Sequence, residues 1–169
     1  EAGGTKFVCA VGKDPDHILA ETKFPTTTPE ETLDKALTFF RDQQEVHGKI
    51  GSLGIGSFGP VDPDIDSPSY GFITSTPKPG WQDTDMAGFF RSNLAIPVGF
   101  DTDVNGAALG EGRWGAAQDV SDYLYLTVGT GIGGGVVSRG KLLHGLVHPE
   151  VGHMLMVQDE SKDPFPGNC

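Results

Sequence analysis

Residues 100–111 read Phe100-Asp101-Thr102-Asp103-Val104-Asn105-Gly106-Ala107-Ala108-Leu109-Gly110-Glu111, and they mark a turn from a strand into a helix. The apolar run at residues 96–100 is typical of a strand, and the small residues after it suit a helix. A carboxylate at this junction lies over the carboxyl end of the sheet, where open α/β sheets bind ligands. The positive end of the helix dipole is expected to favour the ionised carboxylate. Asp101 and Asp103 are therefore candidates for taking a proton from a substrate hydroxyl, and the alternative is that they only cap the helix.

Composition and charge exclude several classes of protein. The 169 residues suit one full domain with part of a second, and a net charge of -11 argues against a nucleic-acid partner, which needs a basic face. No apolar run is long enough to cross a membrane and no signal segment is visible, so we expect no membrane partner. Cys9 and Cys169 form no disulfide framework, which favours a cytoplasmic location. Glu1 is not a methionine and Cys169 falls within a loop, so we expect a longer parent protein.

Strands and helices alternate through the first two thirds of the chain. A helix is expected from Thr28, which begins a capping box with Pro29 at the first helical position, to Gly48. A second helix is expected to begin at Asp83 or Thr84. Strands are expected at residues 7–11, 18–24, 50–55, 70–74 and 96–100. This alternation predicts an α/β fold.

Glycines gather after a further strand, expected at residues 123–128, and we place a domain boundary before it, near Gln118. Gly129, Gly131 and Gly134 fit the dinucleotide pattern G-x-G-x-x-G, which requires a helix directly afterwards. Residues 135–141 read instead as a strand and a turn, so a Rossmann site is excluded. A glycine turn between strands can still offer backbone N–H groups to a phosphate. The residues around Gly3 follow a similar pattern of glycines and apolar residues, which predicts two related hairpins facing each other across a nucleotide. The alternative is that both are ordinary glycine-rich hairpins.

Three histidines and a glutamate crowd the segment that follows. His144, His148 and His153 lie close to Glu150 in the sequence, and Cys169 comes later. Histidine and cysteine are the ligands that zinc prefers, so the segment is compatible with half of a zinc site whose other ligands lie elsewhere. Glu150 is also a candidate acceptor for sugar hydroxyls, and the alternative is a solvated loop carboxylate.

Taken together, these motifs resemble the ROK family of repressors, open reading frames and kinases, and within it the bacterial fructokinases. Six motifs carry the resemblance in the family's order. They are the first phosphate motif at residues 2–7, the sugar loop at 54–62, two fructokinase-like stretches at 76–81 and 100–111, the second phosphate motif at 127–135 and the sugar and zinc motif at 148–153. This resemblance outweighs the interpretation of Asp103 as a cap alone.

The resemblance implies an actin-like, ribonuclease-H-like fold of two α/β domains, with the site in the cleft between them. Residues 1–118 would form the first domain, and residues 119–169 would begin a second domain that is truncated here. The implied activity is ATP-dependent phosphorylation of D-fructose to fructose 6-phosphate by a cytoplasmic homodimer.

The resemblance also assigns roles to individual residues. Asp103 would be the general base that takes the proton from the sugar C6 hydroxyl, and magnesium would bridge the phosphates near Glu1. The phosphates would be held by Gly3, Gly4, Thr5, Lys6, Thr130, Gly131 and Gly133. The sugar would be held by Gly59, Thr102, Glu150 and His153. Zinc would be bound by His153 and Cys169.

Three residues depart from the wider family pattern. Glu1, Phe58 and Thr102 replace residues common in other members, and all three fit the fructokinase subgroup. They argue against a preference for glucose. Mannose, glucose or N-acetylmannosamine remain alternative substrates, because a few hydrogen bonds decide between hexoses. A sugar-sensing repressor remains a second alternative and would need a basic helix-turn-helix before Glu1. A fragment that binds a ligand without catalysis is a third.

Overall fold

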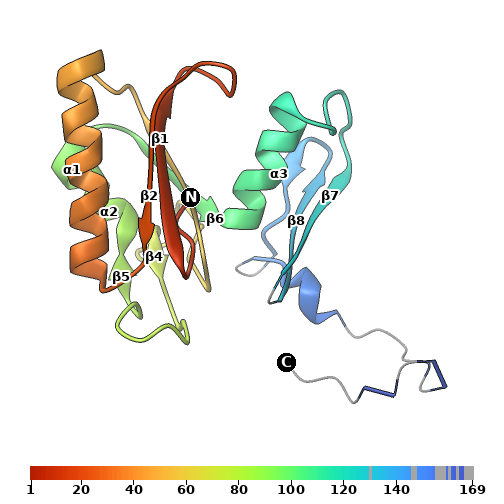
Figure 1. Cartoon of the computed structure of the whole chain (residues 1–169). Coiled ribbons are helices and arrows are strands. Elements are labelled where there is room, and N and C mark those ends of the chain that lie inside the picture. The colour runs from red at the N-terminus through yellow and green to blue at the C-terminus, as the bar shows by residue number, and fades with distance from the viewer. Residues whose placement is uncertain (130, 146–147, 155–158, 160, 163, 166–169) are drawn as a thin grey trace.

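The computed structural model describes residues 1–129, 131–145, 148–154, 159, 161–162 and 164–165. Two groups of elements follow each other along the chain (Figure 1). The first comprises β1 (Lys6–Gly12), β2 (Ile18–Pro25), α1 (Pro29–His47), β3 (Leu53–Ser57), β4 (Phe72–Ile73), β5 (Thr84–Asp85), α2 (Met86–Leu94), β6 (Val98–Thr102) and α3 (Asp103–Trp114). The second comprises β7 (Tyr123–Val128), β8 (Ile132–Ser138), β9 (Lys141–Leu142) and the short 3-10 helix η1 (Val151–His153).

Helix α1 begins and ends where the sequence predicts. The side chain of Thr28 accepts a hydrogen bond from the backbone N–H of Glu31, and Pro29 occupies the first turn, where its missing N–H costs nothing. Gly48 ends the helix with a φ of 87°, a conformation that glycine adopts without strain. The apolar face of the helix is buried against β1.

The start of the second helix differs from the prediction. Asp85, rather than Asp83 or Thr84, caps α2 by accepting a hydrogen bond from the N–H of Gly88 at 2.7 Å. Thr84 and Asp85 pair with β4 in a short antiparallel ladder, and Asp83 lies in the turn before it with a φ of 57°. The two residues predicted as caps are therefore used to bring the chain from β4 into α2.

Helices α1 and α2 cover one side of the strands β1, β2, β3 and β6, and the main core lies between these layers (Figure 1). Trp81 is its largest fully buried side chain. Its ring contacts Phe7 and Phe58, and its Nε1–H donates to the backbone carbonyl of Thr27 at 2.8 Å. The indole N–H is thus satisfied, as burial of a tryptophan requires.

Strands β3 and β6 are parallel, and their register pairs Gly56 with Asp101 and Ser57 with Thr102. Their carboxyl ends therefore reach the same edge of the sheet, and α3 follows β6 directly. Helix α3 packs on its other side against β7 and β8, which form an antiparallel hairpin (Figure 1). The prediction of a strand, not a helix, after the second glycine cluster is confirmed. Within the parts of the chain that the structure describes, no helix is long and apolar enough to cross a membrane.

Candidate active site

Asp103 is the first residue of α3, at the junction that the sequence singles out. Thr102 caps this helix, because its hydroxyl accepts a hydrogen bond from the N–H of Asn105 at 3.1 Å. Oδ1 of Asp103 accepts a hydrogen bond from the N–H of Val104 at 2.9 Å. The carboxylate is half-buried in a cavity of about 390 Å³ whose lining includes Glu1, Gly56, Asp103, Tyr125 and Thr127. The cap is Thr102, so Asp103 is available for another role.

The environment of Asp103 raises the pKa of its carboxyl group above the ordinary value. Burial is the largest cause, and the nearby charge of Glu1 adds to it. The backbone hydrogen bond from Val104 and the proximity of His148 lower the pKa, but burial outweighs them. Burial therefore acts against the ionised form, which the helix terminus is expected to favour. Asp103 is a stronger base than an exposed aspartate, which suits a proton acceptor.

The N-terminal glycine motif forms a tight turn beside this cavity. The N–H of Gly3 donates to the carbonyl of Lys6 at 2.9 Å, and the carbonyl of Gly3 accepts from the hydroxyl of Thr26 at 2.7 Å. A Cβ atom at Gly3 would lie 2.7 Å from the same Lys6 carbonyl oxygen, so glycine is required there. Gly4 is half-buried, whereas Thr5 and Lys6 are exposed to solvent and free to approach a ligand.

The second glycine motif follows β7, whose residues Tyr125 and Thr127 line the same cavity. Thr130 lies outside the described residues, but Gly131 is exposed and Gly133 pairs with Thr127 in the β7–β8 hairpin. Glycine at position 133 allows close packing, because a Cβ there would lie 3.0 Å from the side chain of Val104 on α3. The cavity is thus bordered by Glu1, next to the first glycine motif, and by Thr127, next to the second.

Of the four predicted sugar-binding residues, Gly59 and Glu150 lie close to His148, and His153 lies close to Glu150. His148 lies beside Gly59, since a Cβ atom at Gly59 would be 3.6 Å from its Nε2. Glu150 lies between two histidines, 3.5 Å from Nδ1 of His148 and 3.3 Å from Nδ1 of His153. A cavity of about 510 Å³ is lined in part by Pro60, Thr74, His144, His148 and Glu150. The structure therefore brings the sugar loop and the histidine segment together.

Sequence reasoning missed a hydrogen-bonded network beside the catalytic candidate. Oδ2 of Asp101 lies 2.7 Å from Nε2 of His144, and Oδ1 of Asp101 accepts from the side-chain amide of Asn105 at 2.7 Å. Asn105 is fully buried. The network joins the loop after β9 to the junction between β6 and α3. The spacing of four residues between Asp101 and Asn105 could have indicated their hydrogen bond. The contact of Asp101 with His144 has no signal in the neighbouring sequence.

One predicted zinc ligand, Cys169, lies outside the described residues. The other, His153, contacts Glu150 through Nδ1. Among residues 1–129, 131–145, 148–154 and the few described positions beyond them, no group of three or more His, Cys, Asp or Glu side chains is arranged to hold a metal ion.

Comparison with known proteins identifies the family. The sequence matches the ROK family over residues 1–169. A fructokinase of Zymomonas mobilis is 47% identical over 170 residues, covering 100% of this chain and 56% of the relative. A fructokinase of Streptococcus mutans is 45% identical, covering 100% of this chain and 57% of the relative.

Comparison with solved structures identifies the same family. The structure is similar to that of a ROK family glucokinase from Streptomyces griseus, which was solved in complex with glucose and AMPPNP. The TM-score is 0.76 and the sequence identity is 31%. The match covers 92% of this chain and 49% of the glucokinase chain. The predicted α/β, actin-like fold is thereby confirmed. The chain spans about half the length of the relatives it matches. On sequence and fold alike, this chain belongs to the ROK family.

Proposed function

We propose that the protein containing this chain is an ATP-dependent fructokinase, which converts D-fructose to fructose 6-phosphate. The observation that carries the proposal is the placement of Asp103. Its half-buried carboxyl group, with a raised pKa, lies at the helix terminus in a cavity that is also lined by Glu1, next to the first glycine motif, and by Thr127, next to the second. The fructokinases of Zymomonas mobilis and Streptococcus mutans support fructose as the sugar.

In the proposed reaction, Asp103 accepts the proton of the sugar C6 hydroxyl. The C6 oxygen forms a bond to the γ-phosphorus of ATP, and the bond from that phosphorus to the β–γ bridging oxygen breaks to release ADP. The raised pKa makes Asp103 a better proton acceptor at neutral pH than an ordinary aspartate. Thr102 and Val104 keep the carboxylate in place through the helix cap and the backbone hydrogen bond.

The two glycine motifs are proposed to hold the phosphates. Glycines allow the backbone to approach a phosphate closely, and the exposed Lys6 adds a positive charge. Magnesium would neutralise charge on the phosphates, with the carboxylate of Glu1 available to it in the same cavity as Asp103. The full proposed nucleotide-binding set is Gly3, Gly4, Thr5, Lys6, Thr130, Gly131 and Gly133.

The sugar is proposed to be held by Gly59, Thr102, Glu150 and His153. Glu150 is exposed and can accept hydrogen bonds from sugar hydroxyls, while its contacts with two histidines restrain its side chain. His153 and Cys169 are proposed to contribute to a structural zinc site. The contact of His153 Nδ1 with Glu150 leaves Nε2 for a metal, an arrangement common for zinc-binding histidines.

The proposal includes a cytoplasmic homodimer with a small-molecule sugar as its partner and without nucleic-acid or membrane partners. The test is ADP release by the full-length protein with ATP and magnesium, measured in parallel on fructose, mannose, glucose and N-acetylmannosamine. The proposal predicts the highest kcat/KM on fructose. A higher value on another hexose would change the substrate and keep the class, because such preferences depend on a few hydrogen bonds. Binding of a sugar without any turnover would favour the repressor alternative.

A further inference from the structure

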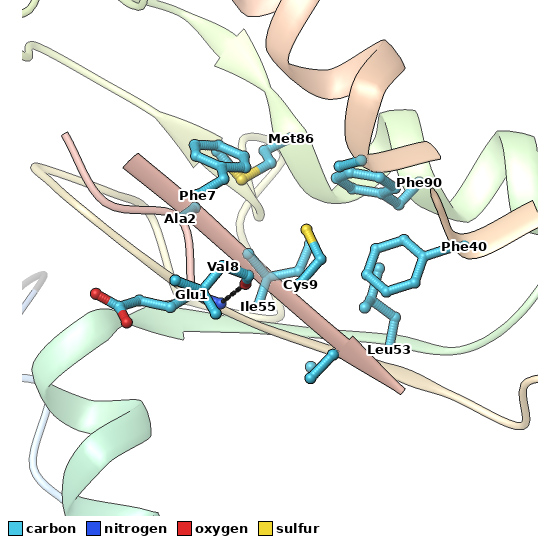
Figure 2. Close-up of a pocket in the computed structure, with 13 residues that line it drawn as sticks. Glu1, Ala2, Phe7, Val8, Cys9, Phe40, Leu53, Ile55, Met86 and Phe90 are labelled. Atoms are coloured by element: carbon cyan, nitrogen blue, oxygen red, sulfur yellow. Dashed lines mark hydrogen bonds between the residues drawn. The ribbon is translucent and has the colours of Figure 1, made fainter. Parts of the chain in front are cut away.

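Glu1, Asp101 and Asp103 are three neighbouring carboxylates with different surroundings. Glu1 and Asp103 both line the cavity of about 390 Å³. The carboxylate of Glu1 points away from the apolar side chains around Cys9 (Figure 2). Asp101 is not among the described residues that line the cavity of Asp103, although it lies only two positions before it. Its role is therefore a different one from proton transfer.

Both oxygen atoms of Asp101 are bonded to protein groups. Oδ1 accepts hydrogen bonds from the backbone N–H of Thr102 and from the side-chain amide of Asn105, each at 2.7 Å. Oδ2 lies 2.7 Å from Nε2 of His144. Because a carboxylate only accepts hydrogen bonds, Nε2 of His144 is the donor. Asp101 thus connects the loop after β9 to the residues with which α3 begins.

The segment that begins at His144 carries two of the proposed sugar-binding residues, Glu150 and His153. Its far end, the helix η1, packs against β8. Among the described residues, the only hydrogen bond from residues 144–154 to the first group of elements is the bond from His144 to Asp101. This bond therefore restrains the distance between the segment and the start of α3.

We propose that His144 is a positioning residue for the sugar, because through Asp101 it holds the segment of Glu150 at a fixed distance from α3. This inference rests on the proposed function, in which Thr102 and Glu150 hold the sugar while its C6 hydroxyl faces Asp103. Without the bond, both parts of the sugar site remain but their separation varies. The sugar then binds more weakly and its hydroxyl is less well aligned. The nucleotide is held by other segments, so its binding does not change.

The first test compares the steady-state kinetics of full-length variants on the hexose that the parent protein phosphorylates best. His144→Leu removes the donor and should raise the KM for the sugar by at least about tenfold, as expected for a lost hydrogen bond to a charged group. The KM for ATP should stay within about twofold of the parent value. His144→Gln should restore the sugar KM to within about threefold, because its side-chain amide offers an N–H at a similar reach. A mere loss of folded protein would lower kcat and leave both KM values unchanged.

His17→Leu is the matched control. Nδ1 of His17 lies 2.7 Å from Oδ1 of Asp14, so this pair has the same length as the pair of His144 and Asp101. It lies on the turn between β1 and β2, and its side chains are 69% and 38% exposed, against 38% and 17% for His144 and Asp101. His17→Leu should leave both KM values at those of the parent protein.

The second test is hydrogen exchange, which does not require the reaction. The N–H of Val151 donates to the carbonyl of Pro149 at 2.9 Å, next to Glu150. His144→Leu should speed exchange of this amide by at least about fivefold, and His144→Gln and His17→Leu should not. If the parent protein phosphorylates no hexose, the proposed function fails and takes the sugar role of His144 with it, even where exchange shows that His144 holds the segment.

Two results would overturn the inference while the proposed function stands. One is a sugar KM of His144→Leu equal to that of the parent protein. The other is exchange of the Val151 amide at the same rate in both proteins, which would mean that the bond to Asp101 does not hold the segment.

Discussion

Replacement of Asp103 by asparagine separates catalysis from folding. The asparagine oxygen can accept the same hydrogen bond from Val104, which measures 2.9 Å, and the cap by Thr102 is untouched. The fold and sugar binding should therefore persist. Loss of the proposed general base should reduce kcat by about 10²–10⁴-fold, or about 3–5 kcal/mol of transition-state stabilisation.

The same substitution should not reduce stability at neutral pH. Since the folded protein raises the pKa of Asp103, this group favours folding only while it is protonated. That contribution is fully present below the ordinary aspartate pKa and is lost as the pH rises through the raised value. Asparagine carries no charge to bury, so the free energy of unfolding at pH 7 should be equal or higher in the variant.

The assay is steady-state ADP release with fructose, ATP and magnesium, accompanied by calorimetric titration of the sugar and unfolding in urea. Asp85→Asn is the matched control, because Asp85 also begins a helix and asparagine caps equally well. It should leave turnover unchanged. Turnover of Asp103→Asn within a few-fold of the parent protein would refute the assignment of Asp103 as the base.

Three further predictions concern the pKa of Asp103, the burial of Trp81 and the packing of Gly135. In a pH–rate profile, kcat should decrease on the acid side as the pH drops through the raised pKa of Asp103. The midpoint of this decrease should lie above the pKa of an ordinary aspartate. A midpoint at or below the ordinary value would contradict the prediction. Trp81→Ala should lower the free energy of unfolding by about 3–5 kcal/mol in a urea titration, because the side chain is fully buried. Gly135→Ala should destabilise the packing of β8 on α3 by about 1–3 kcal/mol, since the new Cβ would overlap the carbonyl of Val104. Gly110→Ala is the control, because a Cβ atom at this position of α3 would meet open space, and it should raise the free energy of unfolding by up to about 1 kcal/mol. Equal effects of the two alanines would count against this packing.

The features that the sequence predicts correctly depend on local signals. Thr28 and Gly48 bound α1 because a side-chain cap and a glycine with a positive φ act within one helical turn. The strand that leads into Asp101 and the helix that begins at Asp103 are likewise indicated by apolar residues followed by small ones. Both signals act between close neighbours in the chain, so they do not depend on how the rest of the molecule packs.

The features that the sequence missed depend on contacts between distant residues. Asp85, not its neighbours, caps α2 because β5 pairs with β4, which local propensity does not encode. His144 meets Asp101 across 43 positions of sequence. The pKa of Asp103 depends on the burial of its carboxyl group and on the charge of Glu1, and both effects come from residues distant in the sequence.

The identity of the phosphorylated product tests the proposed reaction at Asp103 most directly. The full-length protein would be incubated with fructose, ATP and magnesium, and the products followed by phosphorus and carbon NMR. We expect one fructose phosphomonoester, with the phosphate on C6, formed in equal amount to ADP. A phosphate on another carbon would contradict the proposed position of the sugar hydroxyl at Asp103, and ADP without any sugar phosphate would contradict the kinase assignment itself.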